Sequence, residues 1–329
     1  MIAYLVVVGF FIIFQSNEYY LNRILAVIIY FGVVVNSVYL VSNKKNALQF
    51  SLKIVLAIHL LAFYFQLIFY YSGFGFFDFI FPFTGEEQRA FGGNYGIDFL
   101  GGKFIRPTGL YNEPGTYATT IILLFVLYES LVRLESKKIN PLMQWLVVFS
   151  ILLSFSIYGL IFLFIYMFSV IKLNKNFFMV SFLCFLFLFP FIWDAYLYPR
   201  FFSGDYADAG MGFRTEAIIK YLNLVDISLF NLFFGFGFFA DLSEFFGEYV
   251  LNDVGLVFYI LVVGGFIGLI IFLICVLYGS VVSNKTLTFI IIFSLSKISP
   301  SSIIFWFLLT IIVHLSCGKK VYFNDIDKL

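Results

Sequence analysis

Long apolar runs separated by short polar connections dominate this sequence. A helix needs about 20 apolar residues to cross a bilayer, and about ten runs approach that length. Residues 154–156 separate two of these runs, which we predict to form a tight hairpin. The pattern predicts an all-α polytopic membrane protein with about ten transmembrane helices, at residues 1–16, 21–42, 50–72, 115–133, 141–155, 157–173, 177–194, 253–279, 285–298 and 300–317.

The basic residues of the short connections predict the orientation of these spans. Cytoplasmic connections carry an excess of lysine and arginine. With ten spans, the basic short connections all fall on one side of the membrane, at Lys44, Lys45, Arg133, Lys137, Lys138, Lys172, Lys175, Lys285, Lys319 and Lys320. We therefore predict that this side and both termini are cytoplasmic. The first run lacks a basic start and a small-residue cleavage site, so we expect a retained span.

Two connections, residues 73–114 and 195–252, are much longer than the others and are predicted to be extracytoplasmic loops. They contain most of the acidic residues and several arginines. Loops longer than about 12–15 residues are usually functional or disordered, and the abundance of Phe, Tyr and Gly here argues against disorder. We predict a single integral membrane domain, residues 1–329, whose chemistry lies in these outer loops.

Composition supports the membrane assignment. Hydrophobic residues make up 62% of the chain, charged residues 12%, and the mean hydropathy is +1.00, whereas soluble domains have about 25% charged residues. The three cysteines lie in or beside apolar runs, so neither a disulfide framework nor a zinc site is indicated. The only Asp-x-Asp pair in the sequence, Asp325 and Asp327, lies in the predicted cytoplasmic tail, so the long loops contain none. We therefore predict no metal site on the outer face and no cofactor.

The first candidate site is the polar stretch at residues 104–120. Proline is tolerated at the first position of a helix and favours an extended conformation in the residue before it. Pro114 therefore predicts a helix start after an extended Glu113. Asn112 and Glu113 are suited to cap this helix. A cap does not account for Arg106, seven residues before Glu113. We expect this arginine at the membrane surface.

The second candidate site is the pair Arg200 and Arg214 in the longer loop. Arginine stays charged and binds phosphate through two parallel hydrogen bonds. Arginines on the outer face therefore suit a diphosphate ligand. The alternative is a solvated surface charge, or an ion pair with Asp205 or Asp208.

Glycines and histidines in the apolar runs have simpler interpretations. Gly235 and Gly237 predict a flexible turn, and Asn252 and Asp253 are expected to cap the eighth span. The glycines of that span are expected to allow close helix packing, at Gly255, Gly264, Gly265 and Gly268. His59 is interpreted as a buried polar group bridging helices. Neither it nor His314 is expected to reach an outer site.

Several of these features resemble one known family. The run Arg106-Pro-Thr-Gly109-Leu-Tyr111-Asn112-Glu113-Pro114 resembles the R-x-x-G-x-x-x-E-P signature of bacterial O-antigen and capsule repeat-unit polymerases, in the O-antigen ligase–polymerase superfamily. The hairpin at residues 153–159 looks like that family's serine- and glycine-containing turn. Arg214 and the segments 232–237 and 252–256 are similar to its second half. The resemblance covers roughly residues 100–275.

This resemblance implies a GT-C-like architecture and a metal-independent, inverting glycosyltransferase. Such enzymes move a growing glycan from undecaprenyl diphosphate to the non-reducing end of another lipid-linked repeat unit. They act on the outer face of the bacterial inner (plasma) membrane, in O-antigen lipopolysaccharide or capsule synthesis. The implied partners are undecaprenyl-diphosphate-linked oligosaccharides, membrane lipids and a chain-length regulator protein, with no nucleic acid.

A mechanism for the outer loops follows as a hypothesis. Arg106, Arg200 and Arg214 would hold the diphosphate and stabilise the charge that develops as it leaves. Glu113 would accept the proton of the acceptor hydroxyl, with Asp253 and Asp205 as alternatives. Other residues would shape the site, at Gly109, Tyr111, Asn112 and Pro114.

Three alternatives stay open. An O-antigen ligase would share the architecture and transfer the glycan to a different acceptor, but ligases are expected to carry an outer-face histidine, and the long loops contain none. A flippase of lipid-linked sugars would place polar groups near the bilayer midplane, where few occur, at Asn36, His59, Gln66 and Ser169. A structural or receptor-like membrane protein would not need arginines grouped at one loop–membrane boundary.

Overall fold

The computed structural model describes residues 20–90, 97–99, 102–135, 137–170, 216–223, 228–237, 254–280, 284–296, 298 and 302–326. The spans predicted at residues 1–16 and 177–194 lie outside this part of the chain. The chain divides into two compact units, residues 1–48 with 212–329, and residues 49–211. Each unit is described by itself, and the single membrane domain stays a prediction.

Helices occupy most of the described positions of the predicted spans. Four are long and apolar enough to cross a membrane by length and composition, at Leu25–Asn43, Lys45–Phe74, Pro114–Arg133 and Leu256–Ile274. Shorter apolar helices occur at Pro141–Leu153, Ile157–Met167 and Ile303–His314. The chain thus has the helices of a multi-pass membrane protein. The count of ten spans and the cytoplasmic placement of the termini stay predictions.

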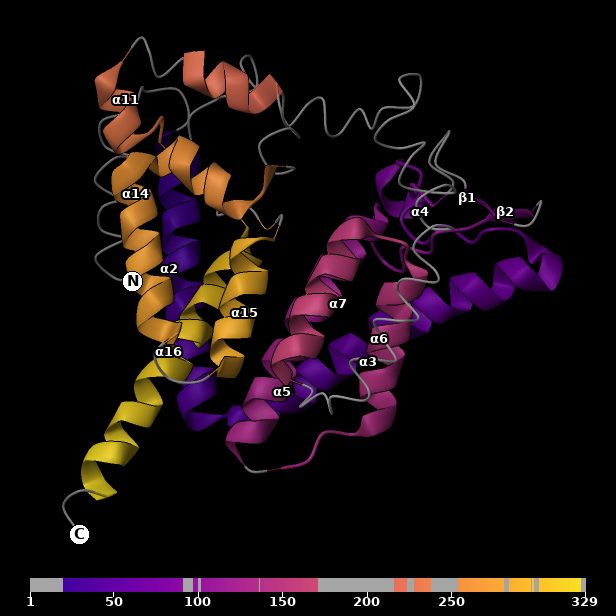
Figure 1. The fold of residues 1–329 in the computed structure, drawn as a ribbon, viewed down its shortest axis with the longest axis horizontal. Helices are drawn as coiled ribbons and strands as arrows, with labels where there is room; N and C mark the ends of the chain where they lie inside the picture. The colour runs from indigo at the N-terminus through magenta and orange to yellow at the C-terminus, as the bar shows by residue number, and fades with distance from the viewer. Residues whose placement is uncertain are drawn as a thin grey trace. The chain divides into compact units, whose positions relative to one another are not determined.

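The second unit is built around helix α5 (Pro114–Leu134), which packs against α6 (Pro141–Leu153) and α7 (Ile157–Val170) (Figure 1). Ile121 and Phe125 of α5 are fully buried, as is Phe162 of α7. The predicted hairpin is confirmed: residues 154–156 join α6 to α7, with Phe155 at a φ of 47°. A Cβ atom on Gly159 would lie 2.7 Å from the Cβ of Ala118, so the α7 backbone approaches α5 closely.

Helix α3 (Lys45–Phe69) presents two different faces along its length. Side chains three or four positions apart share one face of a helix. Buried side chains follow this spacing at Gln49, Leu52, Leu56, Phe63 and Gln66. Large apolar side chains between them are exposed, at Phe50, Ile54, Ile58, Leu61 and Ile68. A helix with one buried polar and apolar face and one exposed apolar face suits a position at the lipid boundary of a membrane protein.

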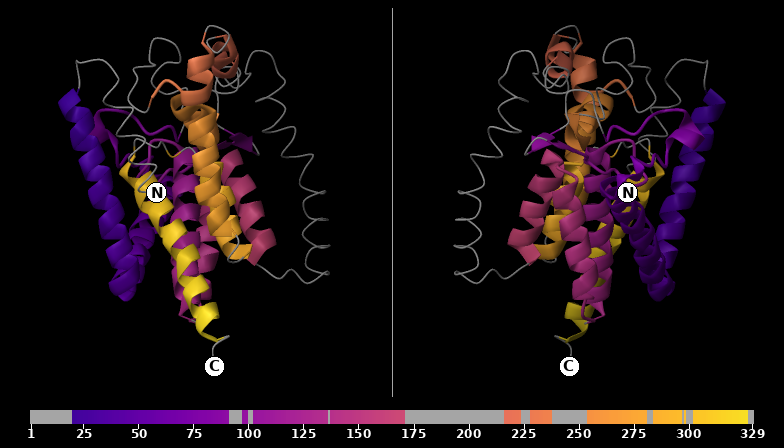
Figure 2. Two further views of the ribbon diagram at one scale, coloured as in Figure 1. Left: turned by 90° about the vertical axis from the view of Figure 1, so that its left-hand side faces the viewer. Right: turned by 90° about the vertical axis from the view of Figure 1, so that its right-hand side faces the viewer.

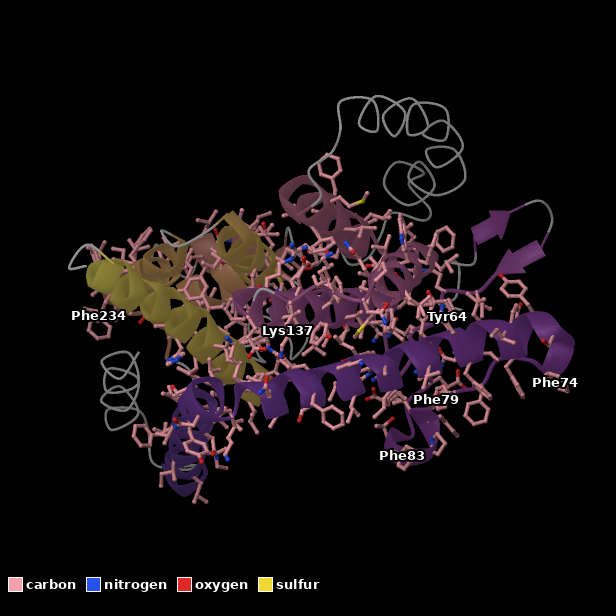
Figure 3. The ribbon with its side chains drawn as sticks, turned by 90° about the horizontal axis from the view of Figure 1, so that it is seen from below. Tyr64, Phe74, Phe79, Phe83, Lys137 and Phe234 are labelled. Atoms are coloured by element: carbon pink, nitrogen blue, oxygen red, sulfur yellow. The ribbon has the colours of Figure 1, made fainter. Side chains whose placement is uncertain are left out.

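Beyond α3 the chain turns back along the helix. A π-helical turn, η2 (Tyr70–Phe74), ends at Gly75, and Phe77 and Phe79 then pack on Phe65 at ring distances of 5.6 and 5.8 Å. Figure 3 shows Phe74 at the end of the helix and Phe79 and Phe83 beside it. Helix α4 (Phe81–Thr84) follows. Residues 77–90 form this fold-back segment, and two of them, Phe77 and Gln88, lie against Gln66 of α3.

The connection before α5 contains a short antiparallel pairing of β1 (Ile97–Phe99) with β2 (Gly102–Phe104), in which Asp98 pairs with Lys103. Strand β2 leads directly into residues 105–113, which precede α5. Residues 106–114, which resemble the polymerase signature and form the signature segment, therefore lie between strand β2 and the first turn of α5.

In the first unit, α14 (Leu256–Ser280) packs against α11 (Leu229–Phe234), α15 (Asn284–Ser294) and α16 (Ile303–Ile326) (Figures 1 and 2). Helix α16 also packs against α2 (Tyr20–Asn43). Tyr30 of α2 stacks on Trp306 of α16 with ring centroids 5.6 Å apart.

Gly265 of α14 does more than allow helix packing, which corrects the sequence interpretation at this position. Gly265 has φ 61° and ψ −165°, so the helix is interrupted there. The N–H groups of Phe236 and Gly237 donate to the carbonyls of Val262 and Val263, at 3.0 and 2.8 Å. In lipid an interrupted helix is tolerated only where other groups satisfy its backbone. The turn after α11 supplies those groups and is fixed in place by them.

Candidate functional site

A buried glutamine of α3 holds the segment before α5. Gln66 donates from Nε2 to the carbonyl of Phe77 at 3.0 Å and to Oε1 of Gln88 at 2.7 Å. Its Oε1 accepts from the N–H groups of Thr108 and Gly109, at 3.1 and 2.9 Å. A side-chain amide has two donor hydrogens and two acceptor lone pairs, so this residue uses its full capacity.

The second glutamine, Gln88, is also buried and also forms four hydrogen bonds. Its Nε2 donates to the carbonyls of Gly109 and Tyr111, at 2.7 and 2.9 Å. Its Oε1 accepts from Gln66 and from the N–H of Phe79, at 3.2 Å. Fully satisfied buried polar networks are rigid. The two glutamines therefore form a fixed frame that joins α3, the fold-back segment and the signature segment.

Gly109 occupies a position that other residues fit poorly. Its φ is +58°, in the left-handed region that favours glycine. A Cβ atom would lie 3.2 Å from the ring of Tyr117 and 3.4 Å from the carbonyl oxygen of His59. The signature segment can therefore pass this closely over α3 and α5 because residue 109 has no side chain.

Glu113 adopts the predicted backbone conformation and a different side-chain role. It is extended, with φ −128° and ψ 143°, and Pro114 begins the helix. Its side chain makes no capping hydrogen bond; the carboxylate forms an ion pair with Arg89. The Nδ2 of Asn112 donates to Glu86 at 3.0 Å. The prediction that the side chains of Asn112 and Glu113 cap the helix is wrong, because charged partners from the fold-back segment bind them instead.

The two arginines of this region lie in opposite environments. The side chain of Arg89 is 69% exposed, and its N–H donates to the carbonyl of Asn112 at 2.8 Å. Arg106 is only 8% exposed, and its N–H donates to the carbonyl of Ala90 at 3.3 Å; its expected position at the membrane surface stays a prediction. The diphosphate-binding role of Arg106 stays a prediction. Arg89 is the more accessible cation of the two.

His59 lies against the signature segment, which the sequence interpretation missed. Its ring stacks on Tyr111 with centroids 5.1 Å apart, and its Nε2 is 3.5 Å from the Tyr111 hydroxyl. His59 therefore contacts the connection between α3 and α5 and does not serve only to bridge helices. Burial raises the pKa of Tyr111 to about 12, so its hydroxyl is protonated at neutral pH and does not act as a base there.

Only part of the predicted site lies in the described residues. Arg106, Gly109, Tyr111, Asn112, Glu113 and Pro114 are brought together at the start of α5. The others lie outside the described part of the chain, at Arg200, Asp205, Arg214 and Asp253. Within the described ranges, no group of three or more His, Cys, Asp or Glu side chains is arranged to hold a metal ion.

Sequence reasoning did not assign Gln88 or Arg89 to the site and treated Gln66 only as a polar residue in a span. A signal for Gln66 was available: His59, Phe63 and Gln66 recur at helical spacing on one face of α3, and an amide buried there must find partners. Nothing in the sequence around Arg89 indicated a role for it in the site.

Comparisons of the chain with protein-family models, with curated proteins and with solved structures found no match.

Proposed function

We propose that this protein is a polysaccharide polymerase of a bacterial inner (plasma) membrane. It would be a metal-independent, inverting glycosyltransferase that moves a glycan from undecaprenyl diphosphate to the non-reducing end of another lipid-linked repeat unit. The main support for the proposal is the environment of Glu113. Within a segment resembling the polymerase signature, this carboxylate does not cap its helix; it is partly exposed beside an exposed arginine.

The proposed reaction needs one base and a stabilised leaving group. Glu113 takes the proton of the acceptor hydroxyl while the hydroxyl oxygen bonds to the anomeric carbon. The bond from that carbon to the diphosphate breaks, and undecaprenyl diphosphate leaves with the electron pair. Arginine side chains stabilise the charge that develops on it. In this proposal Arg106, Arg200 and Arg214 keep the diphosphate-binding role that the chemistry of arginine suggests for them.

The rest of the junction suits a positioning role. The frame of Gln66 and Gln88 fixes the backbone on either side of Gly109, and a group held within a fraction of an ångström reacts far faster than a mobile one. The exposed apolar face of α3 lies on the other side of the same helix. The proposal has the lipid-linked substrate enter from the bilayer with its prenyl tail still in lipid.

Deletion of the gene tests the proposed function. Surface glycan from the deletion strain is compared with the wild type by gel electrophoresis and mass spectrometry. We expect acceptors carrying a single repeat unit and no long chains. Repeat units trapped on the inner leaflet would contradict the proposal and indicate a flippase. Long chains of normal length on the acceptor would also contradict it.

A ligase is a second candidate, favoured by the contact between His59 and Tyr111. Ligases are expected to carry a histidine at the outer site, and this contact brings a histidine to the signature segment although the long loops contain none. The same deletion separates the two functions. A lost ligase leaves long polymer on the lipid carrier and none on the acceptor, whereas a lost polymerase leaves single units on the acceptor.

A further inference from the structure

We propose that Arg89 and Glu113 form an exchangeable ion pair in which a diphosphate group replaces the Glu113 carboxylate on Arg89. Binding of the leaving group would thereby release the base. The role of Glu113 as a base rests on the proposed function, whereas the binding of a diphosphate at Arg89 does not. Arg89 was not among the site residues that the sequence suggested.

The backbone of Arg89 is held firmly. Gln88, its neighbour, forms four side-chain hydrogen bonds, and the N–H of Gln88 donates to Asp78 at 2.7 Å. The N–H of Arg89 itself donates to Asn112, next to Glu113. The position of the Cα atom is therefore fixed beside the signature segment, while the long side chain extends from this frame into an exposed position.

The side chain of Arg89, in contrast, is accessible to a ligand. It is mostly exposed and pairs with a carboxylate that is itself 29% exposed. Exposed ion pairs contribute little free energy because both groups are well solvated when apart. Opening the pair is therefore inexpensive, and a stronger anion can take the place of the carboxylate.

The diphosphate diester of a lipid-linked glycan is such an anion. Its oxygens accept two parallel hydrogen bonds from a guanidinium group, and it carries more negative charge than a carboxylate. Arg106 is less suited to make the first contact because it is buried. The chemistry at Arg89 thus fits the headgroup of a prenyl diphosphate.

The exchange orders the reaction. Glu113 would accept the proton of the acceptor hydroxyl only after the diphosphate had withdrawn Arg89 from it. The proton passes to the carboxylate, the new glycosidic bond forms, and the diphosphate departs with the electron pair while bound to the guanidinium. Without a donor substrate the carboxylate stays paired, so the site would not activate an acceptor or water prematurely.

Binding of inorganic pyrophosphate to the purified protein in detergent tests the exchange, by titration calorimetry. We expect Arg89→Ala to weaken binding on the order of tenfold, as for loss of a charged hydrogen-bond donor. We expect Glu113→Gln to strengthen binding about two- to fivefold, because it removes the competing carboxylate. In the double variant Arg89→Ala/Glu113→Gln, the gain from the second substitution should largely disappear.

Lys137→Ala is the matched control, because Lys137 is an exposed lysine paired with Glu135 beyond the other end of α5. It should bind pyrophosphate like the wild type. Thermal unfolding of every variant identifies any that fails to fold, and Arg89→Lys, which keeps the charge, then replaces Arg89→Ala and should bind with intermediate affinity. Equal binding by wild type, Arg89→Ala and Arg89→Lys would overturn the proposal, as would weaker binding by Glu113→Gln.

A second arm distinguishes free diphosphate from a lipid headgroup. Farnesyl diphosphate, presented in the same micelles, should compete with pyrophosphate and bind more tightly in the wild type than in Arg89→Ala. Binding of pyrophosphate without competition from the prenyl compound would contradict the lipid-linked substrate. If the deletion strain shows normal glycan while the exchange is observed, the proposed function fails and the anion site at Arg89 stands.

Discussion

Both ends of helix α5 hold a glutamate paired with an arginine, but the two pairs have opposite surroundings. At the C-terminal end the side chain of Glu129 is only 3% exposed, pairs with Arg133 and accepts a hydrogen bond from the Tyr166 hydroxyl at 2.7 Å. At the N-terminal end Glu113, which is partly exposed, pairs with Arg89, which is mostly exposed. The same two residue types thus form a closed cluster at one end and an open pair at the other.

The difference indicates which pair is structural. Tyr166 also accepts a hydrogen bond from Gln144 at 3.2 Å, so the closed cluster links all three helices of the bundle. A buried charge is retained only where its partners are maintained, and exchange there would be costly. The open pair has no such constraint. Its surroundings are rigid, through Gln66 and Gln88, while the pair itself can open.

The largest effect should come from breaking the rigid frame of the N-terminal end. Gln66→Leu removes four hydrogen bonds and leaves the buried N–H groups of Thr108 and Gly109 without their partner, at about 1–3 kcal/mol for each unsatisfied group. We expect a loss of about 3 kcal/mol or more in the free energy of unfolding, measured by thermal or denaturant unfolding in detergent.

Gln49→Leu is the control for this substitution. Gln49 is a buried glutamine of the same helix, near the other end of α5, and makes one hydrogen bond, to the carbonyl of Leu131 at 3.0 Å. It should lose about 1 kcal/mol. Equal losses for the two variants would mean that the frame around Gln66 has no special role.

An intermediate effect is expected from the closed cluster. Tyr166→Phe removes the hydroxyl that donates to Glu129 and keeps the ring that packs on Phe125. Because the remaining carboxylate is buried, we expect a loss of about 1–2 kcal/mol, measured in the same unfolding assay. Tyr64→Phe, whose hydroxyl bonds to Leu146 at an exposed position, should lose less. A larger loss for Tyr64→Phe would contradict the contrast in burial.

The comparison also shows what could be predicted from the sequence. The start of α5 and the extended Glu113 follow from Pro114, because proline constrains its own residue and the one before it. The partner of Glu113 could not be predicted, because Arg89 is distant in sequence and reaches it through the fold-back after α3. The role of His59 was missed for the same reason. The helical face on which His59 lies could be predicted, but the contact of Tyr111 with that face could not.

Helix α14 illustrates a different limit. A run of glycines in a span suits both close helix packing and a broken helix. Which occurs depends on whether another segment can satisfy the interrupted backbone, and here the turn at residues 235–237 does so. Sequence pattern alone contains no information on that long-range pairing.

The smallest effect on stability is expected from the open pair. Glu113→Gln removes an exposed ion pair worth less than about 1 kcal/mol, so the amount of protein in the membrane and its unfolding temperature should hardly change. Glu129→Gln removes the buried charge and should lower both. In activity the order should reverse, because of these two glutamates only Glu113 is proposed to touch the substrate.

The most direct test of the account is therefore the length distribution of surface glycan in cells that carry Glu113→Gln or Glu129→Gln, normalised to the amount of each protein in the membrane. We predict that Glu113→Gln gives wild-type amounts of protein and no chains beyond a single repeat unit. Glu129→Gln should give less protein, with the remaining molecules still making long chains. Long chains at the wild-type level per molecule in Glu113→Gln would contradict the assignment of this junction as the active site.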